Sequence, residues 1–238
     1  VRAVERALDI LSVFTEHDSL GMTEIAEKVG LHKSTVYRLL ASLEGKGFLT
    51  RDPATEKYSL GFRVWELSAQ LAGRSDEPGV LLLPEMERLR DLVGETVSLY
   101  IREGYERIRI QSVQSRREIR RVAPVGARLP MHAGASSKVL LAFEEEAERE
   151  RIMNSPAWPA EIDRKAFLRH LEDIRAQGYA TSVEEREAGA AAVAAPIFTG
   201  TGRLAAAVAV SGPSNRLDLK TMREIVPLLK ESARRMGK

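Results

Sequence analysis

Hydrophobic residues between positions 4 and 43 recur with the 3.6-residue period of α-helices in three short stretches. The first stretch predicts a helix that ends near Thr15, and the second predicts a short helix with Thr23 as its N-cap. Gly30 follows and permits a tight turn, because glycine adopts a positive φ at little cost. The third stretch, residues 31–43, predicts a helix with one apolar face, formed by Val36, Leu39, Leu40 and Leu43. Two short helices around a glycine-containing turn are typical of a helix-turn-helix.

The opposite face of the predicted 31–43 helix is polar and free of acidic residues until Glu44. It offers cations, short hydroxyls and a phenol, side chains suited to the major groove of DNA. In isolation the same pattern also fits an ordinary amphipathic surface helix. The residues expected to contact DNA from this motif are Thr23, Lys33, Ser34, Thr35, Tyr37 and Arg38.

A β-hairpin is predicted directly after this helix. Residues 48–52 and 57–61 have β-type composition, and the four residues between them begin with Pro53. A hairpin in this place is the wing of a winged helix-turn-helix. Arg51 and Lys57 flank its tip, where cations meet phosphates and position a protein without reading sequence.

Residues 62–72 predict a helix with two apolar stripes on opposite faces. Phe62, Trp65, Ala69 and Ala72 form one stripe, and Val64, Leu67 and Leu71 form the other. Such a helix can pack against its own domain and against a partner chain, or it can be a buried core helix. The polar, breaker-rich segment 73–79 follows it. We therefore expect three regions: a DNA-binding domain at 1–61, a linker helix and hinge at 62–79, and a second domain at 80–238.

The remainder of the chain alternates helical and strand-like patterns, which predicts an α+β domain on a largely antiparallel sheet. Helices are predicted at 81–93, 136–143, up to 153, 163–177 and 217–236, and strands at 96–102, 107–114, 119–123, 179–182, 193–198 and 204–211.

Composition adds three constraints. The 238 residues carry a net charge of only +2, and residues 1–61 contain eight Lys and Arg against nine Asp and Glu, so DNA affinity must come from the placement of cations. The chain has no cysteine and no apolar run long enough to span a bilayer, which predicts a cytoplasmic protein. Its four histidines lie far apart, so no metal site or cofactor is expected.

Enzymatic motifs find little support in the sequence. Ser136-Ser137-Lys138 invites comparison with a Ser–Lys nucleophile, but no GxSxG elbow accompanies it. The glycine-rich run 200–205 precedes a strand pattern and not a helix, unlike a dinucleotide-binding loop. The basic run 116–121 is interrupted by Glu118 and Ile119, which favours a solvated strand or an inter-subunit surface.

Several motifs together resemble the isocitrate lyase regulator (IclR) family of bacterial transcription factors. The N-terminal motifs are RAVERALDIL, TEIAEKVGLHKSTVYRLLASLEGKGFL and KYSLG; the C-terminal ones are GARLPMHAGASSKVLLA, GYATSVEEREAGAAAVAAPIF and AAVAVSGP. The resemblance implies a winged helix, a dimerising linker helix and a C-terminal GAF-like effector-binding domain. It also implies a homodimer or dimer of dimers on a palindromic operator.

By the same resemblance, a small organic-acid effector would bind between the sheet and the loops at 129–137 and 182–192. The implied lining is Tyr100, Met131, Ala135, Ser136, Ser182, Glu185, Ala192 and Ser211. Ser182 stands where many members carry an acid, and Ala192 where many carry a cysteine. These two departures predict a less polar pocket, in which a larger or aromatic acid competes with a small α-keto acid.

The sequence thus predicts a ligand-responsive DNA-binding regulator, more specifically a repressor of metabolic genes, without enzymatic activity. The alternative is a metabolite sensor or small-molecule enzyme whose winged helix contacts protein.

Overall fold

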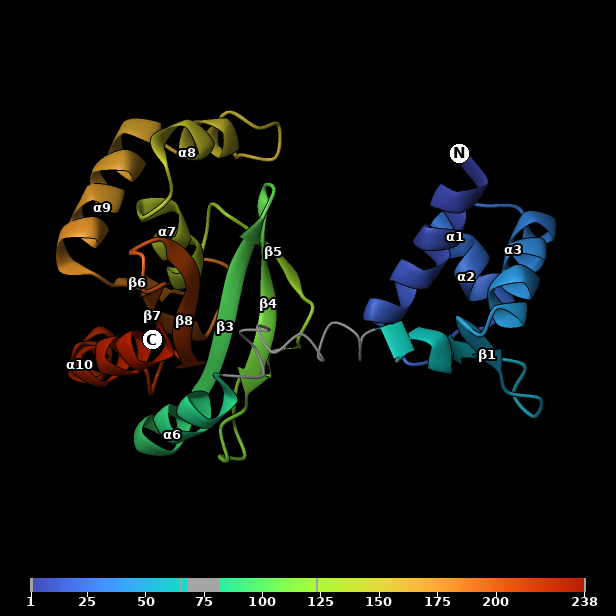
Figure 1. Ribbon diagram of the computed structural model, residues 1–238, viewed down its shortest axis with the longest axis horizontal. Helices are drawn as coiled ribbons and strands as arrows, with labels where there is room; N and C mark the ends of the chain where they lie inside the picture. The colour runs from blue at the N-terminus through green and yellow to red at the C-terminus, as the bar shows by residue number, and fades with distance from the viewer. Residues whose placement is uncertain (1, 65, 68–81, 123, 238) are drawn as a thin grey trace. The chain divides into compact units, whose positions relative to one another are not determined.

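The computed structural model describes residues 2–64, 66–67, 82–122 and 124–237 (Figure 1). The chain divides into two compact units, Val1–Glu77 and Pro78–Lys238. Each unit has a hydrophobic core of its own.

The first unit has the predicted winged helix-turn-helix. Its elements are α1 (Arg2–Ser12), a 3-10 turn η1 (Val13–Thr15), α2 (Met22–Val29), α3 (Lys33–Gly45), β1 (Leu49–Arg51) and β2 (Tyr58–Leu60). The core is built from one face of each helix together with Leu49 of β1 and Tyr58 of β2. β1 and β2 pair antiparallel, and Leu20 bridges to Tyr58 ahead of α2.

The start of α2 differs from the prediction. Its N-cap is Gly21, and Thr23 lies within the first turn of the helix. The Glu24 carboxylate accepts a hydrogen bond from the Gly21 backbone N–H at 2.7 Å, which is the N3 half of a capping box. Gly30 ends α2 with a φ of +64°, as the predicted turn requires.

The predicted linker helix falls mostly outside the described residues. Residues 62–64 and 66–67 are helical, and Phe62 and Leu67 are exposed in this chain. Trp65, Ala69, Leu71 and Ala72, and the segment 73–79, lie outside the described part of the chain. The two-stripe packing and the region boundaries at 61 and 79 therefore stay predictions.

The second unit is built on a six-stranded antiparallel sheet with the order β5-β4-β3-β8-β7-β6. The strands are β3 (Thr96–Glu103), β4 (Glu106–Val113), β5 (Arg128–Pro130), β6 (Ala180–Val183), β7 (Ala190–Phe198) and β8 (Leu204–Pro213). This arrangement confirms the α+β class and the largely antiparallel sheet.

Helices cover both faces of this sheet, which makes three layers (Figure 1). On one face α6 (Leu83–Val93) and α10 (Leu219–Met236) pack on alternate residues of β3, β7 and β8. On the other face lie α7 (Ala135–Ala142), α8 (Glu146–Met153) and α9 (Arg164–Gln177). The period-two alternation of strand side chains supplies both cores.

The strand predicted at 119–123 is not formed. Residues 119–122 are irregular, Ala123 is outside the described residues, and β5 instead pairs with β4 at Arg128–Pro130. Side chains donate hydrogen bonds to backbone carbonyls that would pair with a neighbouring strand if this segment were a strand. Thr96 Oγ1 donates to the Arg121 carbonyl at 2.9 Å, and Arg216 Nη2 donates to the Ile119 carbonyl at 2.9 Å. Such side-chain bonds replace a strand ladder.

β7 extends beyond its neighbour β6. β6 pairs with Ala191–Ala194, whereas β8 pairs with β7 as far as Phe198. Pro196 lies in the overhanging part, where among the described strands only β8 is paired with β7. A proline cannot donate to a strand ladder and is tolerated where a strand has a free edge.

Among the described residues, no helix has the length and hydrophobicity needed to cross a membrane.

Candidate functional site

The polar face of α3 is exposed as the sequence pattern predicts. Val36 and Leu40 are fully buried and anchor the helix, while Lys33, Ser34, Tyr37 and Arg38 are exposed on its other side. Thr35 is half-buried, and Thr23 of α2 is exposed beside the turn that precedes α3. The first unit thus presents hydroxyls, a phenol and two cations on one rigid element.

The two cations of the hairpin after α3 have different surroundings. Lys57 is exposed directly before β2, whereas Arg51 is ion-paired with Glu56 at 2.9 Å. The Arg51 guanidinium also lies over the Tyr58 ring, 5.8 Å from its centroid. Asp52 caps the turn by accepting from the Ala54 N–H and the Thr55 hydroxyl, and these bonds lower the pKa of its carboxyl, the Thr55 bond most.

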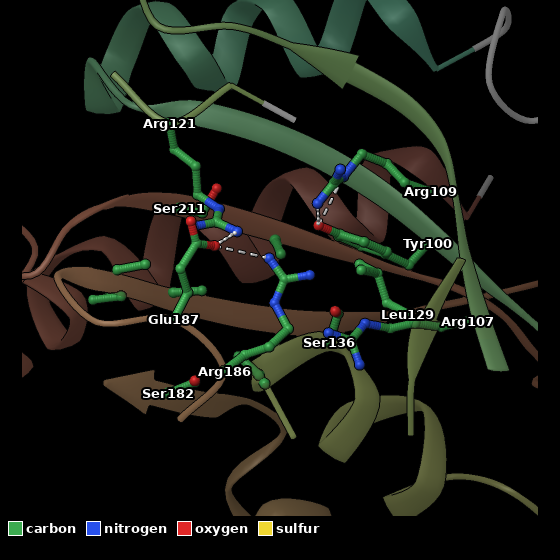
Figure 2. Close-up of a pocket in the computed structure, with 16 residues that line it drawn as sticks. Tyr100, Arg107, Arg109, Arg121, Leu129, Ser136, Ser182, Arg186, Glu187 and Ser211 are labelled. Atoms are coloured by element: carbon green, nitrogen blue, oxygen red, sulfur yellow. Dashed lines mark hydrogen bonds and ion pairs between the residues drawn. The ribbon is translucent and has the colours of Figure 1, made fainter. Parts of the chain in front are cut away.

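The second unit has a pocket between its sheet and the N-terminus of α7 (Figure 2). Six of the eight residues expected around an effector line it: Tyr100, Ala135, Ser136, Ser182, Ala192 and Ser211. Strand register brings three of them together, because Ser182 pairs with Ala192 and Ala192 pairs with Ser211 across three adjacent strands. Residues nearly thirty positions apart in the sequence thus form one row on the pocket wall.

Met131 and Glu185 lie elsewhere. Met131 is buried and lines a neighbouring cavity of about 120 Å³ together with His132 and Trp158. Glu185 is absent from the pocket lining: its carboxylate accepts from the N–H of the lining residue Gly134 at 3.0 Å and from the Lys138 ammonium at 2.5 Å. Glu185 is therefore a tether between α7 and the loop 184–189.

These contacts also describe the Ser-Ser-Lys run at the start of α7. Ser137 Oγ bonds to the carbonyls of Ala133 and Gly134 at 2.8 and 2.7 Å. The buried Lys138 Nζ bonds to the Thr181 carbonyl at 2.7 Å as well as to Glu185. The hydroxyl and the amine thus serve to fasten the helix end. Among the described residues, no group of three or more His, Asp or Glu could hold a metal ion.

Four arginines line the pocket, and the sequence reasoning missed all of them. Arg107 and Arg109 come from β4, Arg121 from the irregular segment before β5, and Arg186 from the loop before β7 (Figure 2). Among the described residues that line the pocket, Glu187 is the one acidic side chain, so these residues carry a net charge of +3 (four minus one). The predicted loss of polarity at Ser182 and Ala192 is outweighed by these cations.

A signal for the first two arginines was present in the sequence. Arg107 and Arg109 alternate with Ile108 and Ile110, so both point to one face of a strand whose other face is apolar. Both residues are only 3% exposed. Arg121 belongs to the basic run that the sequence pattern assigned to solvent or to a subunit interface, and no local pattern distinguishes it from its neighbours.

Tyr100 organises the two β4 arginines. Arg109 donates to the Tyr100 hydroxyl from Nε at 3.0 Å and from Nη2 at 2.9 Å. The Arg107 and Arg109 guanidinium carbons lie 5.7 and 5.2 Å from the centroid of the Tyr100 ring. Contact with a π-face partly compensates guanidinium groups for lost water.

Comparison with known proteins agrees with this architecture. The model of the bacterial transcriptional regulator IclR C-terminal domain matches residues 81–238, and that of the IclR helix-turn-helix domain matches residues 3–53. The HTH-type transcriptional regulator XynR of Escherichia coli K12 is 34% identical over 226 residues, covering 92% of this chain and 88% of XynR. The HTH-type transcriptional repressor AllR of the same strain is 32% identical, covering 91% of this chain and 82% of AllR.

A solved structure is similar over nearly the whole chain. It is an IclR homologue from Microbacterium hydrocarbonoxydans complexed with 4-hydroxybenzoate, with a TM-score of 0.81 and 28% identity, covering 99% of this chain and 97% of that one. Together with the two family models, these similarities confirm the family indicated by the sequence motifs. The chain is therefore a DNA-binding transcriptional regulator and belongs to the IclR family.

Proposed function

We propose that this regulator is a repressor that reads a palindromic operator through α3 and responds to a small organic acid bound in the arginine-lined pocket. The observation that carries the proposal is α3 itself, whose buried Val36 and Leu40 fix an exposed face containing Tyr37 and Arg38. Repression is supported by similarity to AllR, which is named a repressor. An acidic effector is supported by the cationic pocket and by the relative complexed with 4-hydroxybenzoate.

The proposal assigns different work to the two groups of DNA contacts. Side chains of α3 (Lys33, Ser34, Thr35, Tyr37 and Arg38) reach base edges and set the sequence preference, and Thr23 supports them from α2. Lys57 and Arg51 of the hairpin contact phosphates; Arg51 exchanges Glu56 for a phosphate when it does so. The protein acts as a homodimer or a dimer of dimers, because helix-turn-helix dimers read half-sites separated by about one helical turn. It acts by binding, without turnover, in the cytoplasm.

A gel-shift experiment with the DNA upstream of its own gene tests this function. Arg38→Ala should weaken binding to the operator by about 1–3 kcal/mol per lost base contact, while binding to random DNA changes little. Lys57→Ala should instead weaken binding to both DNAs and reduce the salt slope by about one. Lys220→Ala, an exposed cation of the other unit, is the matched control and should leave both affinities unchanged.

Two results would contradict the proposal. An equal loss on operator and random DNA for Arg38→Ala would remove this residue from base reading. No salt-sensitive, competitor-resistant shift, with or without organic acids, would exclude operator binding and favour a winged helix that contacts protein.

A further inference from the structure

Two arginines of the pocket are deeply buried, and neither is ion-paired with a carboxylate within the described residues. Arg109 donates to the Tyr100 hydroxyl and to the Pro124 carbonyl, the latter at 3.0 Å. Arg107 donates from Nη1 to the carbonyls of Pro130 and Ala133, and its Nε is buried with no hydrogen-bond partner in the described structure. A desolvated cation with an unmade hydrogen bond is unfavourable until an anion reaches it.

Arg107 also lies near the N-terminus of α7, which is the positive end of the helix dipole. Its guanidinium is beside Ser136, in the first turn of the eight-residue helix α7 (Figure 2). The Gly134 N–H is taken by Glu185, but the amides of the first helical residues point away from the helix toward its N-terminal end. Burial is the main cause that lowers the pKa of Arg107, to about 10, so the group is still charged at neutral pH. A buried cation with an unpartnered Nε and the N-terminus of a helix thus meet at this end of the pocket.

A second cationic end lies on the other side of the pocket (Figure 2). There the Glu187 carboxylate is 2.6 Å from Arg121 Nη2 and 3.3 Å from Arg186 Nη2. The Arg121 side chain is 16% exposed, whereas that of Glu187 is 58% exposed and can swing into solvent. Arg121 and Arg186 are therefore already paired with a carboxylate, that of Glu187. Glu187 has a long, largely exposed side chain and lies on the loop 184–189.

The free space between the two ends is small. The cavity measures about 50 Å³, enough for a few water molecules. Glu187 and Arg186 both belong to the loop 184–189, so displacing their side chains would enlarge this space without any change in the sheet.

We propose that the pocket binds a small dicarboxylate, with one carboxylate at Arg107 and the N-terminus of α7, and the other at Arg121 and Arg186 in the place that Glu187 occupies. This inference rests on the proposed function, which makes this pocket the effector site. Glu187 is held close to its arginines by the chain and competes at high effective concentration. A free monocarboxylate competes poorly with it, whereas a dicarboxylate anchored at Arg107 delivers its second group intramolecularly. The exchange of Glu187 for a ligand carboxylate thus selects dianions.

Calorimetric titration of the full-length chain with matched acid pairs tests this selection. The pairs are succinate with butyrate, glutarate with pentanoate, and terephthalate with benzoate; 4-hydroxybenzoate is added as a single-charge aromatic acid. In at least one pair the diacid should bind about tenfold more tightly, the equivalent of one charge-assisted hydrogen bond. Glu187→Gln should raise the affinity for that diacid several-fold, because the internal competitor loses its charge.

Two further variants make the test specific. Glu184→Gln changes a neighbouring carboxylate of the same loop that bonds to Ser214 at 2.6 Å and is absent from the pocket lining, so its affinities should match the native protein. Arg121→Gln should remove the preference for the diacid while leaving monoacid binding unchanged. Because Glu187 is exposed, its variant folds, and the test does not depend on the arginine variants.

Three outcomes would overturn the inference: equal affinity for diacid and monoacid in every pair, a weaker diacid affinity in Glu187→Gln, or no diacid binding to either protein. Parallel gel shifts separate the inference from the proposed function. If monoacids bind as well as diacids and release DNA, the function stands and the dianion selection fails. If diacids bind selectively and no operator complex forms, the dianion site stands and the proposed function fails.

Discussion

Arg107 shows how much one strand position can decide in this protein. Ile110 of β4 packs on the α6–α10 side of the sheet, and because side chains alternate along a strand, Arg107 must enter the layer beneath α7. The helix approaches closely there because Gly134 has no side chain. Gly134 adopts φ +100° and ψ 153°, a conformation that is essentially restricted to glycine.

Gly134→Ala should therefore destabilise the second unit. A methyl group at this position would lie 2.8 Å from Arg107 Nη2, and the backbone would be strained in addition. We expect a loss of about 1–3 kcal/mol in the free energy of unfolding, measured by urea denaturation. Gly200→Ala is the control, because nothing lies within 4 Å of its added methyl; equal stability losses in the two variants would refute the explanation.

His132 gives the stability a pH dependence near neutrality. Burial, followed by the charge of Arg107, lowers the pKa of its imidazole below the ordinary value of 6.5. Between the two pKa values the unfolded chain binds more protons than the folded one, so stability falls as pH drops below about 6.5. Urea midpoints measured from pH 7.5 to 5.5 should fall for the native protein and fall less for His132→Gln. Parallel curves for the two proteins would exclude His132 as the cause.

At the scale of elements, an ion pair between the buried Lys138 and the partly exposed Glu185 fastens the loop 184–189 to α7. Lys138 is nearly inaccessible, whereas the Glu185 carboxylate is partly exposed and also holds the Gly134 N–H. The pair is therefore asymmetric: removing either partner leaves the other in a different environment.

This asymmetry predicts unequal losses of stability. Glu185→Ala leaves the buried ammonium with only the Thr181 carbonyl as partner and should cost about 3 kcal/mol of unfolding free energy. Lys138→Met keeps the buried stem and leaves a carboxylate that can hydrate, so its loss should be smaller. Thermal or urea unfolding of both variants gives the comparison, and a larger loss for Lys138→Met would reverse the assignment.

Elements were more predictable from the sequence than the pocket. Periodicity located α3, α9 and the hairpin because each buries one face in a regular pattern, whereas α7 is buried along its whole length. The strand predicted at 119–123 was wrong because Thr96 and Arg216, which are distant in sequence, donate hydrogen bonds to backbone carbonyls of this segment. The row Ser182–Ala192–Ser211 came from family motifs, whereas Arg121 and Arg186 reach the pocket from irregular segments that carry no periodic signal.

At the scale of the whole molecule, regulation requires that a ligand bind two states of the protein with different affinity. The C-terminal part of the first unit, where the sequence predicts a linker helix at 62–72, is the covalent route for that coupling, and its described residues include the exposed Leu67. The sequence pattern places this residue on a stripe available to a second copy.

Leu67→Lys should therefore weaken self-association. An ammonium group in an apolar interface is strongly unfavourable, so the sedimentation coefficient should shift toward that of the monomer. Leu92→Lys on α6 is matched in exposure, at 53% for both native leucines, and should leave the mass unchanged. An unchanged mass for Leu67→Lys would remove this side chain from the interface.

The overhang of β7 beyond β6 has a consequence for handling the protein at high concentration. The overhanging part of β7 has no partner on its β6 side among the described strands, and an unpaired strand edge next to an alanine-rich ladder can act as a template for another chain. Pro196 interrupts that template, since it offers no N–H to an incoming strand. Replacing it with a strand-forming residue such as threonine would give fibrils or precipitates at concentrations where the native protein stays clear, a solubility function that is independent of DNA and effector.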